Sequence, residues 1–377
     1  MPEQPHRRRV LTGLAVGIGS LSGCVGQVQE YIPAGTEDPP ADPPKDPNQN
    51  NTEDPDESEP TDEPDDRKLH HGETIPMYPY AETKTDPLNP QSDPDADNPV
   101  LTAADVDDVD AAYVYDPFLF VEDDEWHMFF TVRADGRGRI AYAKSDDEGV
   151  SWEYDRMVLN LRNHVSFPNV FKWDGSYYMT VQQSPRESPV SLYKANSFPH
   201  EWYRTVELFD PTDYDHGMTD RSLFRWDGRW WCIGGDNRGD TYLYYSDELD
   251  RSGWEPHEQN PVVSDRPAGA RPGGRPIVRD SDVLMFFRSL VGGFGSEINA
   301  YRITELTPST YEDSVHPASP LISGTNRLDS EGEPEWNADR MHQFDPWYLG
   351  EGDGWRIAVD GDDGTDNWSI GIYRVSE

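Results

Sequence analysis

The chain of 377 residues has only two cysteines, Cys24 and Cys232, and only six lysines against 26 arginines. So few cysteines exclude a disulfide-dense scaffold and a zinc site built on cysteine. We expect Cys232, within the aromatic run "RWWCI", to be a small core residue. The formal net charge of −40 leaves no basic stripe for a phosphate backbone, which excludes nucleic acid as a partner.

Acidic residues crowd the whole chain, including its folded part. A uniformly acidic, lysine-poor surface favours solubility in high salt, where the short screening length weakens self-repulsion. The composition therefore predicts a halophilic archaeon as the source.

Residues 1–24 combine a basic start, a short apolar run and small residues before Cys24. The run is too short to span a bilayer and indicates an export signal. The arginines at 7–9 fit a twin-arginine signal, and "LSGC" resembles a lipobox that would make Cys24 the lipidated first residue. The alternative is an ordinary cleaved signal. We expect an exported protein on the outer face of the cytoplasmic membrane, which it contacts through the lipid anchor alone.

Residues 25–97 are rich in proline, aspartate and glutamate. Such a segment buries too little apolar surface to offset its ordering entropy, so it is predicted to be a disordered tether. The folded domain is expected to occupy residues 98–377 and to be a monomer.

Five strand–turn–strand units follow one another in this domain. Their alignment brings one position of each unit into register, at intervals of 51, 53, 55 and 70: Pro117, Pro168, Arg221, Pro276 and Pro346. Each unit has a third strand with alternating apolar and polar residues, and four have a fourth strand. A strand-only repeat near 50 residues predicts an all-β, five-bladed β-propeller.

The fifth unit ends after its third strand, while a spare "NPVLTA" at 98–103 precedes the first unit. It resembles "NPVV" at 260–263, which ends the third unit. We therefore predict that residues 98–103 form the outer strand of the last blade and close the ring, which removes an exposed edge.

The first strand of each propeller blade lines the central channel, so the residues that lead the five units should converge at one rim. Three of them are aspartates: Asp116, Asp220 and Asp345. Further polar residues near these positions are predicted to bind a ligand: His164, Arg221, Arg271, Arg275 and His342. The alternative for the arginines is ion pairing with neighbouring aspartates. The long insert 305–340 is expected to overhang the mouth.

Asp116 in "YDPFLF" and Asp220 in "TDRSLFRWDGRWW" resemble two of the three catalytic carboxylates of the five-bladed glycosidases of families 43, 32 and 68. That resemblance implies a glycan ligand. It implies that Asp116 is the general base and that Asp220 tunes its pKa and orients the sugar.

A longer series of motifs covers the whole propeller: "NPVLTAADV", "DPFLF", "SFPNVF", "DGRWW", "GGRP" and "MHQFDP…WRIAVDGD". In this order they resemble the N-terminal domain of plant glucosamine inositolphosphorylceramide transferase and its prokaryotic relatives. The resemblance does not extend to the separate glycosyltransferase domain of the plant proteins, so it implies no transferase activity.

One motif departs from the glycosidase pattern. Family 43 enzymes carry a general-acid glutamate at the start of the fourth blade, where this chain has Gly274 beside Arg275. Hydrolysis needs an acid to protonate the leaving oxygen, and Glu297 or Asp345 could supply it only from elsewhere. Alternatively, Arg221, Arg271 and Arg275 could bind phosphate or a phospho-sugar, which resembles the phosphorylases of family 130.

The sequence thus leaves three functions open: a carbohydrate-active enzyme at the channel, a glycan-binding lipoprotein without turnover, and an interaction scaffold that uses a rim. We expect no organic cofactor. The many carboxylates leave room for a channel cation such as calcium, although no spacing resembles a calcium loop.

Overall fold

The computed structural model describes residues 86–184, 188–214, 217–279, 281–293, 295–350 and 352–376. The expected export signal with Cys24 and most of the expected tether lie outside these ranges. Within the described residues no helix has the length and apolar character needed to cross a membrane.

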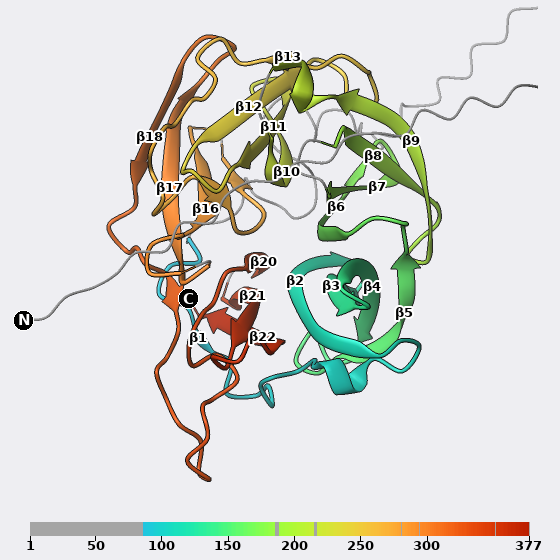
Figure 1. Cartoon of the computed structure of the whole chain (residues 1–377), viewed down its shortest axis with the longest axis vertical. Coiled ribbons are helices and arrows are strands. Elements are labelled where there is room, and N and C mark those ends of the chain that lie inside the picture. Colours follow the sequence, from blue (N-terminus) through green and yellow to red (C-terminus); the bar gives the residue numbers. More distant parts are fainter. Residues whose placement is uncertain are drawn as a thin grey trace, which may run out of the picture. The chain divides into compact units, whose positions relative to one another are not determined.

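Five antiparallel sheets form the blades of a β-propeller (Figure 1). Blade 1 contains β2 (Ala111–Glu122), β3 (Glu125–Ala134), β4 (Arg137–Ser145) and β5 (Glu153–Leu159). Blade 2 contains β6 (Val165–Trp173), β7 (Ser176–Gln183), β8 (Val190–Ser197) and β9 (Glu201–Phe209). Blade 3 contains β10 (Thr219–Trp226), β11 (Arg229–Gly235), β12 (Thr241–Ser246) and β13 (Glu255–Pro256).

Blade 4 has a divided inner strand, and blade 5 takes its outer strand from the other end of the chain. Blade 4 contains β14 (Arg271–Pro272), β15 (Ile277–Val278), β16 (Val283–Arg288), β17 (Glu297–Leu306), β18 (Tyr311–Val315) and β19 (Ile322–Ser323). Blade 5 contains β20 (Phe344–Gly350), β21 (Gly354–Asp362), β22 (Trp368–Val375) and β1 (Gln91–Ser92). The described part of the chain also contains the short 3-10 helices η2 (Ala103–Asp105) and η3 (Pro211–Tyr214). The all-β, five-bladed prediction is confirmed.

The hairpins and the core follow from the sequence pattern. The tips use acidic residues and glycine at positive φ, as at Asp227 (49°) and Gly228 (74°), because tight hairpins need that backbone region. Aromatic side chains fill the space between adjacent blades. Phe171 packs on Trp230 at 5.6 Å between ring centroids, and Phe286 packs on Phe344 at 4.8 Å.

The ring closes through the last blade, as predicted. Leu101 and Ile370 exchange backbone hydrogen bonds, and Gln91 pairs with Arg374 in β22. In Figure 1 the closing segment runs beside the red strands of blade 5. The outer strand itself is β1, at Gln91–Ser92, and residues 98–103 add only the isolated bridge of Leu101 to Ile370. The ordered chain thus begins before residue 98, and the expected boundary of the tether at 97 lies too far along the chain. Backbone pairing with β22 and the burial of Asp93 fix this earlier segment.

Asparagine side chains make the same pair of backbone hydrogen bonds in the outer segments of blade 5 and blade 3. Asn98 donates from its amide to the carbonyl of Ile372 (2.8 Å) and accepts from the Ile372 amide (2.7 Å). Asn260 makes the same pair of bonds with Leu243, at 2.7 and 2.8 Å. The sequence likeness of "NPVLTA" and "NPVV" therefore reflects one structural role: the asparagine side chain forms hydrogen bonds with a backbone amide and carbonyl at the outer edge of a blade.

Candidate functional site

β-Bulges position the residues that lead the first three blades. Pairing shifts where β2, β6 and β10 pass Asp116, Phe167 and Asp220, and these residues have φ of 52°, 56° and 51°. Such values are uncommon outside glycine, and a bulge re-aims the side chain that it carries. The bulges turn Asp116 and Asp220 toward the channel mouth.

A pocket of about 240 Å³ lies there. Its lining combines tyrosines, a tryptophan, histidines, arginines and aspartates: Tyr113, Tyr115, Asp116, His164, Ser166, Asp220, Arg271, Arg288, Arg340, His342, Asp366 and Trp368. Nine residues of the propeller were predicted to form the site, and five of them line this pocket: Asp116, His164, Asp220, Arg271 and His342.

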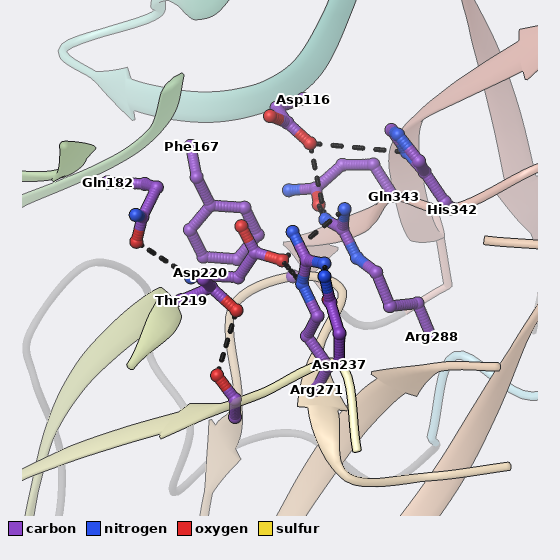
Figure 2. Close-up of polar contacts among 12 residues, drawn as sticks. Asp116, Phe167, Gln182, Thr219, Asp220, Asn237, Arg271, Arg288, His342 and Gln343 are labelled. Atoms are coloured by element: carbon purple, nitrogen blue, oxygen red, sulfur yellow. Dashed lines mark hydrogen bonds and ion pairs between the residues drawn. The ribbon is translucent and has the colours of Figure 1, made fainter. Parts of the chain in front are cut away.

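Arg288 connects the two leading aspartates (Figure 2). Its guanidinium lies 3.2 Å from Asp116 Oδ1 and 3.4 Å from Asp220 Oδ2. It also donates to Gln343 Oε1 at 3.3 Å, and it lies 5.5 Å from the ring centroid of Phe167. One buried cation therefore holds both carboxylates at a fixed separation.

Asp220 is the more strongly ion-paired of the two aspartates. Arg271 Nε donates to its Oδ2, and Arg271 also donates to Asn237 at 2.6 Å. Burial alone would raise the pKa of Asp220, but Arg271 and Arg288 outweigh burial and lower that pKa below its ordinary value. Asp220 is therefore an ionised carboxylate at neutral pH.

Asp116 has the opposite electrostatic character. Burial raises its pKa to about 6, with Arg288 and His342 opposing the rise and the like charges of Asp220 and Asp360 adding to it. Asp116 thus exchanges its proton close to neutral pH.

Asp360 anchors this part of the site from β21. It accepts hydrogen bonds from the backbone amides of Asp116 (2.9 Å), His342 (3.1 Å) and Gln343 (2.9 Å). It also contacts His342 Nδ1 at 2.8 Å. The His342 ring stacks on Trp368 at 4.0 Å between centroids. Asp360 therefore fixes both the bulge at Asp116 and the orientation of the imidazole.

His164 lines the pocket on the blade 2 side. Its Nδ1 accepts from the Gly138 amide at 2.7 Å, and Arg133 Nη1 lies 3.2 Å away. Burial and the charge of Arg133 lower the pKa of His164 to about 4. The ring is therefore neutral at physiological pH.

Four predicted ligand-binding residues do not line the pocket. Arg275 and Asp345 are buried against each other, with Arg275 Nε 3.0 Å from Asp345 Oδ1. Unlike the leading residues of the first three blades, Asp345 pairs regularly with β21, so no bulge turns it toward the mouth.

Arg221 and Glu297 are the other two residues that lie outside the pocket lining. Arg221 follows Asp220 in β10 and is fully buried, where it donates to the Ser188 carbonyl at 3.1 Å. Glu297 accepts from Asn299 at 3.2 Å in β17, away from the pocket lining. The expected anion site of three arginines therefore does not assemble, because only Arg271 reaches the mouth.

The backbone of blade 4 explains the missing general acid. A Cβ atom at Gly274 would lie 1.9 Å from the Phe344 carbonyl oxygen. The close approach of Gly273 and Phe344, which share a 2.7 Å backbone hydrogen bond, leaves no space for a side chain. A glutamate at 274 is incompatible with this packing.

Asp116, His342 and Asp360 offer ligand atoms within 4.8 Å of one another, a spacing compatible with a cation. The Arg288 guanidinium already lies against Asp116, and the Asp360 oxygens accept from three amides and the imidazole. A second positive charge beside Arg288 would be repelled. The donor set therefore does not fit a metal ion well.

Sequence reasoning missed Arg288, Asp360 and Arg340. The first two come from the ends of second strands, β16 and β21, which return to the rim where the first strands start. The antiparallel connection was a usable signal, because the end of each second strand must lie beside the start of the first. Arg340 comes from the end of the predicted insert, which does reach the mouth.

The fold is that of the glycosidase-type propellers. β-1,2-Mannobiose phosphorylase from Listeria innocua superposes with a TM-score of 0.57 at 13% identity, over 77% of this chain and 97% of that one. The catalytic domain of the family 62 α-L-arabinofuranosidase of Coprinopsis cinerea superposes with a TM-score of 0.55 at 13% identity, over 79% and 98%. At such identity the likeness shows the fold alone.

Sequence comparison is more specific. Residues 77–362 match the family "Glucosamine inositolphosphorylceramide transferase 1, N-terminal", and the chain belongs to this family. Glucosamine inositolphosphorylceramide transferase 1 of Oryza sativa subsp. japonica is 31% identical over 277 residues, which are 70% of this chain and 35% of that protein. The chain spans about a third of the length of the curated relatives that it matches.

Proposed function

We propose that this protein is a carbohydrate-active propeller that binds a glycan end in the channel-mouth pocket and cleaves or transfers a glycosidic bond there. One observation carries the proposal: Asp116 and Asp220 lie on either side of Arg288 in one pocket and differ in proton affinity. Carboxylates with separated pKa values are the arrangement that glycoside chemistry uses.

In this proposal Asp116 is the general base that takes the proton of the attacking water or hydroxyl. The leaving oxygen takes its proton from solvent water, because the packing at Gly274 leaves no space for a general-acid glutamate. A carboxyl group with a pKa of about 6 is largely ionised at pH 7 and accepts a proton more readily than an ordinary aspartate. Asp220 stays ionised, raises the pKa of Asp116 by its charge and accepts hydrogen bonds from sugar hydroxyls. Arg271 and Arg288 orient the same hydroxyls.

The named relatives support the substrate class. The structural relatives are named as an arabinofuranosidase and a β-1,2-mannobiose phosphorylase, and the curated relatives are named glucosamine inositolphosphorylceramide transferases. The pocket is large enough for about one sugar ring. These relatives point to a saccharide, and the activity of the longer plant proteins is not carried over.

The test is release of sugar from polysaccharides and oligosaccharides in molar salt. Asp116→Asn keeps the shape and tolerates the positive φ but cannot accept a proton, and we expect a loss of at least about 100-fold in kcat/KM. Asp247→Asn, which removes an exposed aspartate from its pair with Arg229, is the control and should retain full activity. Unchanged turnover in Asp116→Asn would exclude the mechanism.

A second candidate is a glycan-binding protein without turnover. It is favoured by the packing at Gly274, which excludes the usual general acid, and by the burial of Arg275 against Asp345. Calorimetric titration that detects saccharide binding, together with no product after prolonged incubation, would select it. Product formation that depends on Asp116 would exclude it.

We further propose that the protein is exported and held at the cell surface of a halophilic archaeon. The support is the sequence of residues 1–24, with its arginines and Cys24, and the acidic composition. Cys24→Ala should move the protein from the membrane fraction to the medium. If that variant stays with the membrane, lipidation at Cys24 is not the anchor.

A further inference from the structure

We infer that the pocket selects an uncharged sugar and excludes anionic ones, and that the Arg340–Asp366 ion pair at its rim determines this specificity. The inference rests on the proposed glycan function and names the ligand class of the same site.

Each guanidinium in the lining contacts aspartates of this chain. Arg271 and Arg288 contact Asp220, and Arg288 also contacts Asp116. An anion site normally presents an arginine fork to its ligand, because two parallel N–H groups match a carboxylate or phosphate. Here a ligand carboxylate would have to compete with buried protein carboxylates that already occupy these cations.

At the rim of the pocket, Arg340 is likewise paired with aspartates of this chain. Arg340 Nε donates to Asp362 at 2.7 Å, and Nη2 donates to Asp366 at 2.6 Å. The Asp362 side chain is fully buried, whereas the Asp366 side chain is 79% exposed. Asp366 therefore neutralises Arg340 at the point where a ligand enters.

The charges around the pocket sum to a negative value. Counting the lining residues and the charged residues in contact with them, four guanidiniums stand against six carboxylates: Arg133, Arg271, Arg288 and Arg340 against Asp116, Asp220, Asp339, Asp360, Asp362 and Asp366. Even a protonated His342 leaves more negative than positive groups. An anionic sugar would thus meet repulsion that the buried, poorly screened setting enhances.

Paired aspartates and arginines suit sugar hydroxyls. A hydroxyl both donates and accepts, so one hydroxyl can donate to an aspartate oxygen while it accepts from the adjacent guanidinium. The indole of Trp368 is engaged by His342 at 4.0 Å and by Arg340 at 5.1 Å from the ring centroid. The ring centroids of Tyr113 and Tyr115 lie 5.4 Å apart, and these two side chains give the pocket an aromatic surface for a bound sugar ring.

The test uses the full chain in molar salt and calorimetric titration with matched probes: glucose with glucuronate, galactose with galacturonate, and mannose with mannose 6-phosphate. We expect the neutral member of at least one pair to bind at least about tenfold more tightly than its anionic partner. Equal or tighter binding of the anionic member in every pair that binds would overturn the inference.

Asp366→Asn tests the role of the rim pair. Asparagine removes one charge, keeps the shape and tolerates the φ of 61° at this position. Because Arg340 is then less neutralised, the preference for the neutral sugar should narrow several-fold through tighter binding of the uronate. Asp247→Asn should leave the preference unchanged, and an unchanged preference in Asp366→Asn would exclude the rim pair as its origin.

The outcome remains decisive if no sugar binds. That result leaves the proposed function to the sugar-release assay, and titration with inorganic phosphate would then decide the charge selectivity alone. Absence of phosphate binding supports an anion-excluding pocket. Stoichiometric phosphate binding that is lost in Arg271→Met would overturn it.

Discussion

The backbone amide of Asp116 donates a 2.9 Å hydrogen bond to the carboxylate of Asp360, although 244 residues separate them in sequence. Asp116 leads the first blade, and Asp360 lies near the end of β21, the second strand of the last blade. Ring closure makes these two strands neighbours. The proposed base is therefore held by one of the contacts that join the first blade to the last.

Asp116→Asn should stabilise the fold at neutral pH. The pKa of Asp116 is about 6 in the folded chain and 3.8 as the ordinary value, so the folded state binds the proton more tightly. The free energy of unfolding of the parent protein should therefore fall as the pH rises from about 4 to about 6. At pH 7 the variant should gain up to about 3 kcal/mol, measured by chemical denaturation.

This gain should vanish below about pH 4, where the aspartate is protonated in both the folded and the unfolded chain. Asp247→Asn, at an exposed position, should show no such pH-dependent difference. A variant whose advantage is the same at pH 4 and pH 7 would contradict the raised pKa of Asp116.

Arg288→Met should destabilise the protein strongly. It removes the buried cation between Asp116 and Asp220 and leaves two like charges facing each other. Loss of one partner from such a network costs roughly 3–5 kcal/mol. The pKa of Asp116 should also rise above 6, because Arg288 lowers it, and the acid limb of the pH–rate profile should move to higher pH.

The matched control is Arg156→Met, at an arginine whose side chain is 56% exposed beside Asp155. Its free energy of unfolding should change by no more than about 0.5 kcal/mol. If the two substitutions lowered the free energy of unfolding equally, the burial of the Arg288 ion pairs would make no additional contribution to stability.

His164→Gln should weaken ligand binding without moving the pH midpoint of activity. The pKa of His164 is lowered to about 4, so the ring is already neutral wherever Asp116 titrates. The measurement is kcat/KM between about pH 5 and pH 8. A displaced midpoint would mean that His164, and not Asp116, carries the titration.

Asn98→Ala should weaken the closed ring. It removes two hydrogen bonds to Ile372 and leaves a backbone amide and carbonyl at the edge of blade 5 without these partners. We expect a loss of roughly 1–3 kcal/mol in the free energy of unfolding. Asn260→Ala, which removes the equivalent bonds to Leu243, should cost a similar amount. If Asn260→Ala lowered the free energy of unfolding and Asn98→Ala did not, the closing segment would contribute little to stability.

Repeat alignment was enough to predict the blades, the closure of the ring by an N-terminal segment in the last blade, and the convergence of Asp116 with Asp220, although the closing strand is Gln91–Ser92 and not residues 98–103. These features follow from strand periodicity, which the sequence carries directly. Alignment failed for Asp345 because equivalent positions do not share one backbone conformation. Asp116 and Asp220 lie in bulges at positive φ, whereas Asp345 continues a regular ladder.

The error at Arg221 has a simpler cause. Alignment gives the position of a residue along the strand but not the face that its side chain takes, and Arg221, beside the channel-facing Asp220, is fully buried in the core. Arg288 and Asp360 were missed because neither leads a repeat. Their positions at the ends of second strands could have been used, since those ends meet the leading residues at the same rim.

The ion pairs between Arg288 and the two leading aspartates differ from the exposed ion pairs of this acidic protein in their access to water. The side chains of Asp116, Asp220 and Arg288 are each 2% exposed, whereas the Arg156 side chain, in its pair with Asp155, is 56% exposed. Dissolved ions screen charges that water reaches and hardly affect charges that it does not. The binding geometry should therefore stay the same from dilute buffer to brine, even while the repulsion across the outer surface changes with every step in ionic strength.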